Sequence, residues 1–178
     1  MLLSQENPKR VVASFAKLIP PGRVLDLGCN TGRNALFLAS NHEVDAVDIS
    51  AEALKLINSE NITKFHQDIQ DFLFDKQYAG IICTDTLHFL AIDKIENTFA
   101  KMKKHTVKGG INIITVFTKN GELVLDAIKH YFEPDELKSY YSDWKIIAYE
   151  LKMGDCHARK SDGTPFRHES AILVAQKN

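Results

Sequence analysis

Short apolar runs alternate with amphipathic stretches along this chain up to about residue 118. Continuous apolar runs bounded by glycine, proline or acidic residues predict buried strands, and apolar residues three or four positions apart predict helices. The predicted strands are residues 23–28, 43–50, 62–68, 78–85 and 111–118, and the predicted helices are residues 8–19, 31–41, 51–58 and 91–105. Strands that alternate with helices form a parallel sheet with helices on both faces, which predicts a doubly wound α/β fold.

The pattern changes after residue 118. Residues 133–144 predict a helix that begins at a Glu-Pro pair, and residues 145–153 and 169–177 predict two strands. Because no helix lies between these two strands, we expect an antiparallel hairpin on one edge of the mostly parallel sheet. The polar residues 154–168, which are rich in turn formers, are the expected connection.

The composition is ordinary for one globular domain: 178 residues, 44% hydrophobic and 25% charged, which is enough for a sizeable core. A net charge of −1 gives no support for nucleic-acid binding. The three cysteines are far apart, so neither a disulfide framework nor a metal site is predicted. No apolar run approaches the ~20 residues of a membrane span, and the N-terminus lacks a signal peptide, so we expect a cytoplasmic protein.

The stretch "VLDLGCNTGRN" carries the first chemical signal. Asp26 ends an apolar strand, although aspartate is a poor strand residue and is costly to bury unpaired. In open α/β sheets the carboxyl ends of the strands border the ligand crevice, so Asp26, Gly28, Asn30 and Gly32 are predicted to line it. Glycine lets the backbone approach a ligand closely, and asparagine tolerates the left-handed conformation. A carboxylate that only caps the turn is the alternative.

The spacing of these residues narrows the choice of ligand. A Walker A sequence is absent, and the spacing Gly-x-x-x-Gly does not match the dinucleotide fingerprint. Asp48 ends the next strand, 20 residues after Gly28, where a carboxylate would accept hydrogen bonds from a ribose diol. The Asp26 carboxylate would repel a pyrophosphate, but it suits a ligand with an ammonium and a sulfonium. S-adenosyl-L-methionine has both.

These motifs resemble those of class I S-adenosylmethionine-dependent methyltransferases. "VLDLGCNTG" resembles the first motif, with Asn30 in place of its middle glycine, and "VDAVDIS", "FHQDIQDF" and "IICTDTLHFL" resemble the next three. The resemblance implies a Rossmann-like fold, S-adenosyl-L-methionine as cofactor and S-adenosyl-L-homocysteine as product. It also implies that Asp48 binds the ribose, that Asp68 and the Ile69 backbone meet the adenine, and that Thr84 lies near the methionine part.

The candidate cofactor-binding residues lie at or just after these strand ends: Asp26, Gly28, Cys29, Asn30, Gly32, Arg33, Asp48, Ile49, Asp68, Ile69, Thr84 and His88. Several have a purely structural alternative. Asp48 is also placed to cap the next helix, and Asp68 to lie in a solvated turn. His88 lies among apolar residues, so a histidine buried in the core competes with a contact to the acceptor.

The C-terminal part resembles the tellurite-resistance (TehB-like) methyltransferases in "FEPDELKSYYSDWKIIAYE" and "GDCHARKSDG…SAILVAQK". The resemblance implies that His157 faces the methyl acceptor, although Ala158 stands between it and Arg159. We therefore predict His157 and Arg159 as catalytic residues, with Arg33 or His88 as further acceptor contacts. Such cations suit a small anionic acceptor, such as an oxyanion of tellurium or selenium, or a thiol. A solvated loop around His157 is the alternative.

Without an internal repeat or a linker, we expect one methyltransferase domain over residues 1–178. Its expected parts are an N-terminal helix (8–19), a cofactor-binding core (23–117) and a substrate-side helix and hairpin (118–178). The expected partner is a small-molecule acceptor, without nucleic acid or membrane, and the sequence allows a homodimer. The alternatives are a methyltransferase for RNA or protein, a non-catalytic S-adenosylmethionine-binding module and a nicotinamide oxidoreductase.

Overall fold

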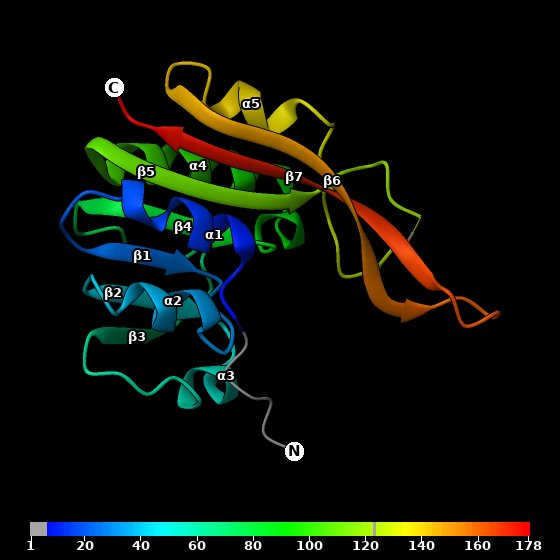
Figure 1. Cartoon of the computed structure of the whole chain (residues 1–178), viewed down its shortest axis with the longest axis horizontal. Helices are drawn as coiled ribbons and strands as arrows, with labels where there is room; N and C mark the ends of the chain where they lie inside the picture. The colour runs from blue at the N-terminus through cyan, green and yellow to red at the C-terminus, as the bar shows by residue number, and fades with distance from the viewer. Residues whose placement is uncertain (1–6, 123) are drawn as a thin grey trace.

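The structure is a computed structural model that describes residues 7–122 and 124–178; the side chains of residues 156–158 lie outside this description. One seven-stranded sheet has the order β3-β2-β1-β4-β5-β7-β6 (Figure 1). Its strands are β1 (Val24–Leu27), β2 (Val44–Asp48), β3 (Ile62–His66), β4 (Tyr78–Thr84), β5 (Thr106–Phe117), β6 (Lys145–Arg159) and β7 (Pro165–Gln176). Strands β1 to β5 pair in parallel, whereas β7 is antiparallel to β5 and β6. The predicted doubly wound sheet with an edge hairpin is confirmed.

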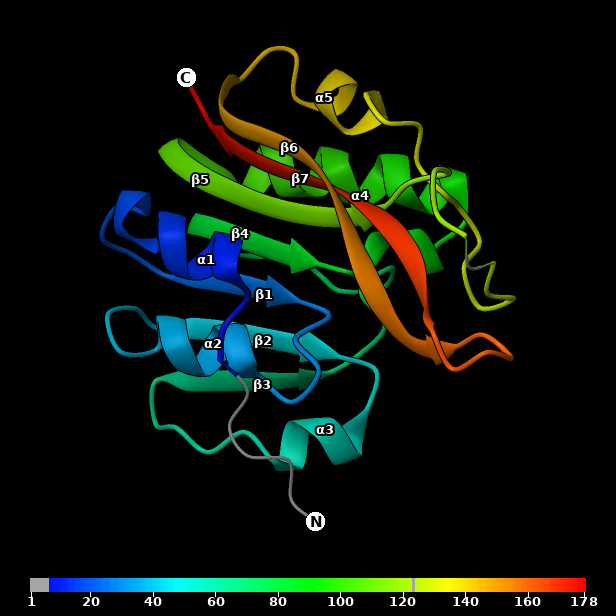
Figure 2. The same ribbon diagram turned by 45° about the vertical axis from the view of Figure 1, so that its right-hand side comes forward.

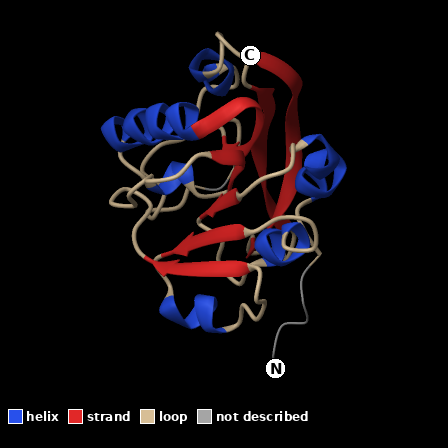
Figure 3. Cartoon of the chain, turned by 90° about the vertical axis from the view of Figure 1, so that its left-hand side faces the viewer, coloured by secondary structure: helices blue, strands red, loops and turns tan. Residues whose placement is uncertain are grey.

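Helices cover both faces of the sheet (Figure 3). They are α1 (Arg10–Phe15), α2 (Arg33–Leu38), α3 (Ala51–Lys55), α4 (Ile92–His105) and α5 (Glu136–Tyr140), with 3-10 turns η1 (Ala16–Leu18) and η2 (Leu87–Phe89). One buried cluster contains residues of α1, α2 and α3, and the other contains residues of α4 and α5. Strand β5 contributes to both, because Ile111 and Ile113 point to one face while Ile114 and Val116 point to the other.

Several element boundaries differ from the prediction. Residues 107–110, expected to end a helix in a loop, begin β5; Gly109 adopts φ 76° there, and the register with β4 shifts between Tyr78 and Gly80. A glycine-containing bulge lets the strand start before its apolar run. Helix α5 covers only part of the predicted residues 133–144. The hairpin is longer than predicted, because most of the expected connection 154–168 continues the two strands.

The topology places a ligand crevice at one edge of the sheet. Strand β1 lies between β2 and β4, so the chain order reverses beside it, and the loops after these strands diverge. The hairpin extends past this edge (Figures 1 and 2), since Phe117 at the end of β5 pairs with Ser170 and residues 165–169 continue beyond it. Among residues 7–122 and 124–178, no helix combines the length and apolar composition that crossing a membrane requires.

Candidate functional site

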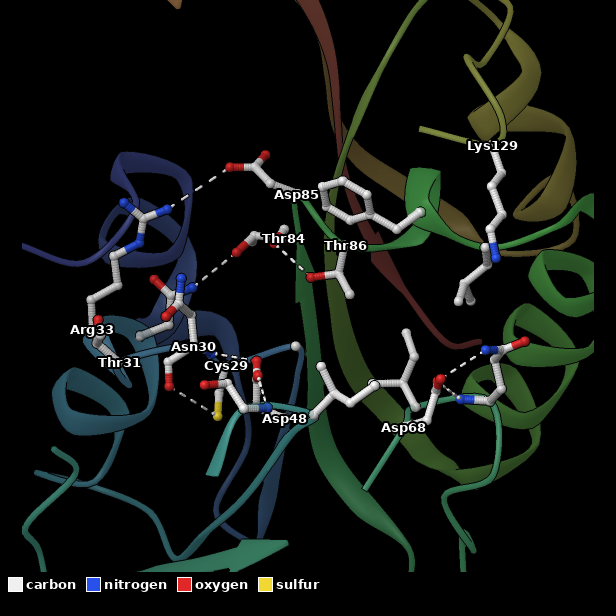
Figure 4. Close-up of a pocket in the computed structure, with 18 residues that line it drawn as sticks. Cys29, Asn30, Thr31, Arg33, Asp48, Asp68, Thr84, Asp85, Thr86 and Lys129 are labelled. Carbon is white, nitrogen blue, oxygen red and sulfur yellow. Dashed lines mark hydrogen bonds and ion pairs between the residues drawn. The ribbon is translucent and has the colours of Figure 1, made fainter. Parts of the chain in front are cut away.

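A cavity of about 700 Å³ opens at the carboxyl ends of β1, β2, β3 and β4 (Figure 4). Its volume lies in the range of small-molecule sites. The lining residues come from the loops after these strands and from the segment after β5: Gly28, Cys29, Asn30, Thr31, Arg33, Asn34, Asp48, Ile49, Ser50, Asp68, Ile69, Gln70, Thr84, Asp85, Thr86, Phe89, Leu90 and Lys129. Most of the predicted cofactor-binding residues are therefore brought to one cavity.

The loop after β1 needs glycine at its first position. Gly28 has φ 71°, and a Cβ atom there would lie 2.2 Å from Oγ1 of Thr86. Asn30 also has a positive φ, 49°, which asparagine tolerates better than most residues. The amide of Gly28 donates a 2.9 Å hydrogen bond to the carbonyl of Val47 in β2. The loop is thus fixed to the neighbouring strand and passes close to the η2 side of the cavity.

Asp48 joins the loops that follow β1 and β2. Its Oδ2 accepts a 2.7 Å hydrogen bond from the Asn30 amide, and its Oδ1 accepts a 2.8 Å bond from the Ser50 amide. Helix α3 is capped by Ser50, whose hydroxyl accepts from the amide of Ala53 at 3.1 Å. Because each carboxylate oxygen accepts more than one hydrogen bond, Asp48 keeps capacity toward the cavity that it lines.

Asp68 and Ile69 form one end of the cavity. The Asp68 carboxylate accepts bonds from the Gln70 amide at 3.0 Å and from Nε2 of Gln70 at 2.9 Å. Ile69 presents an almost fully buried apolar side chain beside them. An acid, an amide and an apolar wall suit a flat heteroaromatic ring with an exocyclic amine. The sequence indicated Asp68 and Ile69 but not Gln70, whose role depends on the turn.

The opposite end is polar and charged (Figure 4). Asp85 follows β4 with φ 55°, forms an ion pair with Lys9 and lies 3.8 Å from Nη2 of Arg33. Thr84 accepts a 3.1 Å hydrogen bond from Nδ2 of Asn34. Oδ1 of Asn34 in turn accepts from the Lys9 amide at 2.9 Å, which ties the segment before α1 to the site. Asp85 was missed at the sequence level, although it follows a buried strand directly, as Asp48 does.

Asp26 lies beneath the loop and not on the cavity wall. Its side chain is 1% exposed, and neither carboxylate oxygen has a hydrogen-bond partner in the described part of the chain. Burial raises the pKa of Asp26 to about 7; the nearby backbone N–H of Ala35, which lies outside hydrogen-bond geometry, and the charge of Arg33 offset only part of this rise. Burial also raises the pKa of the Cys29 thiol, so this cavity-lining cysteine is not a thiolate at neutral pH.

Two other predicted residues lie in the core instead of the cavity wall. His88 is fully buried, stacks on Phe117 with ring centroids 4.2 Å apart, and accepts a 3.4 Å hydrogen bond from the Phe117 amide. Burial lowers the pKa of His88 to about 4, so the ring is neutral. Gly32 adopts φ 82° before α2, where a Cβ atom would lie 2.6 Å from Ile57. Both residues lie behind the cavity wall and not on it. For His88, this geometry fits the alternative of a histidine buried in the core.

The predicted catalytic residues lie on the hairpin. Arg159 is exposed near the end of β6, where it pairs with Pro165, and it does not line the cavity. The side chain of His157 lies outside the described residues. Sequence reasoning missed Lys129 and Phe89, which line the cavity, because nothing near them in the sequence indicates a ligand.

Comparison with known families decides the classification. The family model "Tellurite resistance protein TehB" matches residues 7–173. The chain belongs to the TehB family. A TehB-family relative, named probable S-adenosyl-L-methionine-dependent methyltransferase TehB, from Haemophilus influenzae, is 30% identical over 174 residues. That alignment covers 93% of this chain and 61% of the relative.

Solved structures agree with this placement. The crystal structure of TehB from Haemophilus influenzae superposes with a TM-score of 0.84 at 30% identity, covering 94% of this chain and 62% of that one. This TehB-family chain therefore spans about three fifths of the length of these relatives. A methyltransferase from Burkholderia thailandensis, solved with 1,6-didemethyltoxoflavin and S-adenosylhomocysteine, superposes with a TM-score of 0.70 at 20% identity, covering 95% and 77%. At that identity the likeness shows the fold alone.

Proposed function

We propose that this TehB-family protein is an S-adenosyl-L-methionine-dependent methyltransferase that releases S-adenosyl-L-homocysteine. The observation that carries the proposal is the position of Asp48. Two backbone amides orient its carboxylate on the wall of the cavity, between the glycine loop and the Asp68 end. A ribose diol can donate two hydrogen bonds to such a carboxylate.

In the proposed orientation, an adenosyl group lies in this cavity with its adenine at the Asp68 end and its ribose at Asp48. Asp68, Ile69 and Gln70 offer an acid, an apolar wall and an amide to the adenine, and Asp48 then meets the ribose. The bound sulfonium supplies an activated methyl group, so the protein needs mainly to align the acceptor and exclude water. Phe89 and Leu90, in and directly after η2, add apolar surface to the cavity wall.

For the acceptor we propose a small molecule, either an anionic one such as a tellurium or selenium oxyanion, or a thiol. Two cationic side chains, Arg33 and Lys129, line the cavity, and Arg159 and His157 on the hairpin are the proposed acceptor-side residues. An oxyanion or thiolate needs no strong general base, and no neutral histidine or unpaired carboxylate lines the described cavity wall. RNA or protein as acceptor is the alternative, and the net charge of −1 disfavours RNA.

The test combines binding with turnover. Calorimetry with S-adenosylmethionine and S-adenosylhomocysteine comes first, followed by transfer of the labelled methyl group to tellurite, selenite, thiols and small amines. Binding together with transfer to an oxyanion or thiol is the expected result. Binding without transfer to any acceptor would favour a cofactor-binding module, and absence of binding would remove the proposed function. A cytoplasmic location and a homodimer stay predictions from the sequence.

A further inference from the structure

His168 lies on the hairpin, just beyond the end of β5. Strands β5 and β7 pair as far as Phe117 and Ser170, so His168 lies two positions past the last pair, at the edge of the sheet where the cavity opens. Side chains alternate along a strand, so His168 and Phe117 lie on the same face of the sheet. Their rings are in contact, with centroids 4.4 Å apart. No sequence motif indicated His168, because its position depends on strand pairing.

Strand β6 leaves space beside the imidazole of His168. Gly154 is its cross-strand partner, and a Cβ atom on Gly154 would lie 3.9 Å from both Nε2 and Cε1 of the ring. Apart from its chain neighbours, no other described residue has an atom within 4 Å of that position. The φ of Gly154 is not in the left-handed region, so its backbone does not require glycine. What glycine provides here is room next to a ring nitrogen.

The charges around His168 leave its ring neutral. Burial has the largest effect and lowers the pKa of His168 below its ordinary value, while the carboxylate of Asp85 opposes this change only in part. The other titratable groups that act on this ring, or lie on a segment packed against it, are Lys9 before α1, His88 in η2, Asp155 on β6, which pairs with Arg167, and Glu122, which pairs with Lys160. A neutral imidazole can accept a proton.

Asp85 connects this position with the cofactor cavity. Asp85 lines the cavity, whereas His168 and Gly154 do not, so they lie outside the volume that the cofactor fills. An acceptor also has to approach from outside that volume. We infer that the methyl acceptor is a thiol, which binds in the space beside Gly154, and that His168 takes up its proton. This inference rests on the proposed function and specifies the acceptor.

The transfer is balanced without a further reactant. A lone pair of the acceptor sulfur forms a bond to the methyl carbon, and the bond from that carbon to the sulfonium sulfur breaks, which releases S-adenosylhomocysteine. The thiol proton moves to a ring nitrogen of His168, and water then removes it from the imidazolium. A thiol is mostly protonated at neutral pH, so a base accelerates this step.

The surroundings of His168 favour sulfur over a multiply charged oxyanion. The ring of Phe117 offers an aromatic contact, which sulfur atoms favour. The carboxylate of Asp85 raises the pKa of His168 and so stabilises the imidazolium that forms, whereas it would repel an oxyanion.

Two thiol probes separate proton uptake from binding. At pH 7, 2-mercaptoethanol is protonated, whereas thioacetate is already ionised. With labelled S-adenosylmethionine, His168→Gln should lower kcat/KM for 2-mercaptoethanol by about 100-fold or more, and that for thioacetate by no more than about threefold. His42→Gln is the control, because His42 lies before β2 at the opposite edge of the sheet.

Gly154→Ala tests the space beside the ring. Its added methyl group should lower kcat/KM for both probes by about 5- to 100-fold and leave the Kd of S-adenosylhomocysteine within about twofold. Gly163→Ala, on the same hairpin, is the control. Unchanged kinetics in either test variant, or equal losses with both probes in His168→Gln, would overturn the inference. Wild-type transfer to selenite or tellurite but to neither thiol would also overturn it, whereas failure to bind S-adenosylhomocysteine would remove the proposed function itself.

Discussion

Asp48 serves both the backbone and the ligand site, and the two roles are separable by mutation. Asp48→Ala removes the acceptor for the Asn30 and Ser50 amides and for a ribose, while Ser50 still caps α3. The Kd of S-adenosylhomocysteine should rise by about 10- to 100-fold while the chain remains folded. Calorimetry and circular dichroism measure the two effects. Asp71→Ala, an exposed acid off the cavity wall, is the control, and an unchanged Kd in Asp48→Ala would remove the ribose assignment.

The buried Asp26 carboxyl makes stability depend on pH. Its pKa is about 7 in the folded protein against an ordinary value of 3.8, so between these values the native state holds a proton that the unfolded chain has released. Raising the pH from 4 to 7 should therefore destabilise the protein, by about 3 kcal/mol from this group. Asp26→Asn should abolish this dependence. Urea unfolding of both proteins from pH 4 to pH 8 measures it, and parallel pH profiles would contradict it.

At the residue scale, sequence reasoning succeeded where a polar residue follows a buried strand. Asp48, the last residue of β2, carries that signal, whereas Asp68 follows the mostly exposed β3 and was indicated by the family resemblance; both line the cavity. Asp85 carries it too, but its partners Lys9 and Thr115 come from distant segments, so its charge environment exists only in the folded chain. His88 illustrates the opposite case, since a histidine among apolar residues has the same local sequence whether it faces a ligand or Phe117.

At the scale of elements, the loop after β1 depends on a steric fit to the segment that follows β4. Gly28→Ala would place a Cβ atom 2.2 Å from Oγ1 of Thr86 in a left-handed conformation. The free energy of unfolding should fall by about 2–5 kcal/mol, the sum of the conformational and overpacking costs. Urea denaturation measures this change.

Gly163 provides the matched control for that variant. It has φ 83° at the tip of the hairpin, and no atom of the described residues lies within 4 Å of an added Cβ atom. Gly163→Ala should therefore show only the conformational cost of about 1–2 kcal/mol. Adding Thr86→Ala to Gly28→Ala should recover part of the loss. Equal destabilisation by the two alanine variants would contradict a steric role for Gly28.

The hairpin of β6 and β7 extends past the carboxyl edge of the sheet. His157 is predicted from the sequence to contact the acceptor, so His157→Ala should lower turnover by about 10- to 100-fold, as for the loss of one charge-assisted contact, and it should leave the Kd of S-adenosylhomocysteine nearly unchanged. Steady-state kinetics with the acceptor found by screening, together with calorimetry, separate the two effects. Full activity of the variant would favour the alternative in which His157 lies in a solvated loop. Lys152→Ala, on the same strand, is the control.

Helices and strands were predictable where a single periodicity dominates the pattern of hydrophobic residues. Helix α4 and strand β4 match their predicted ranges closely, because each has an uninterrupted helical or apolar pattern. The start of β5 and the length of the hairpin were not predictable. The neighbouring sequence of Gly109 and Gly110 is typical of a loop. Residues 154–168 are polar because the hairpin is exposed beyond the sheet. Pairing with a neighbouring strand, rather than local propensity, determines where β5 begins and how long the hairpin is.

At the scale of the whole molecule, the cavity joins parts of the chain that belong to both halves of the sheet. Its walls come from the loops after β1, β2, β3 and β4 and from Lys129, which follows β5. The ion pair of Lys9 with Asp85 adds the segment before α1. A ligand that fills this cavity contacts segments that separate on global unfolding, so its binding energy should appear as stability of the entire fold.

Thermal unfolding with different ligands uses this coupling to distinguish an adenosyl sulfonium site from a nicotinamide dinucleotide site. S-adenosylhomocysteine at about 100 times its Kd should stabilise the native state by about 2.7 kcal/mol, which corresponds to a Tm increase of roughly 5–10 °C for a domain of this size. NAD should give no increase, because the loop after β1 has the spacing Gly-x-x-x-Gly and lacks the Gly-x-Gly-x-x-Gly fingerprint that lets the backbone approach a pyrophosphate. Asp48→Ala should reduce the shift with S-adenosylhomocysteine at the same concentration. A shift with NAD and none with S-adenosylhomocysteine would favour an oxidoreductase and would contradict the cofactor assignment for this cavity.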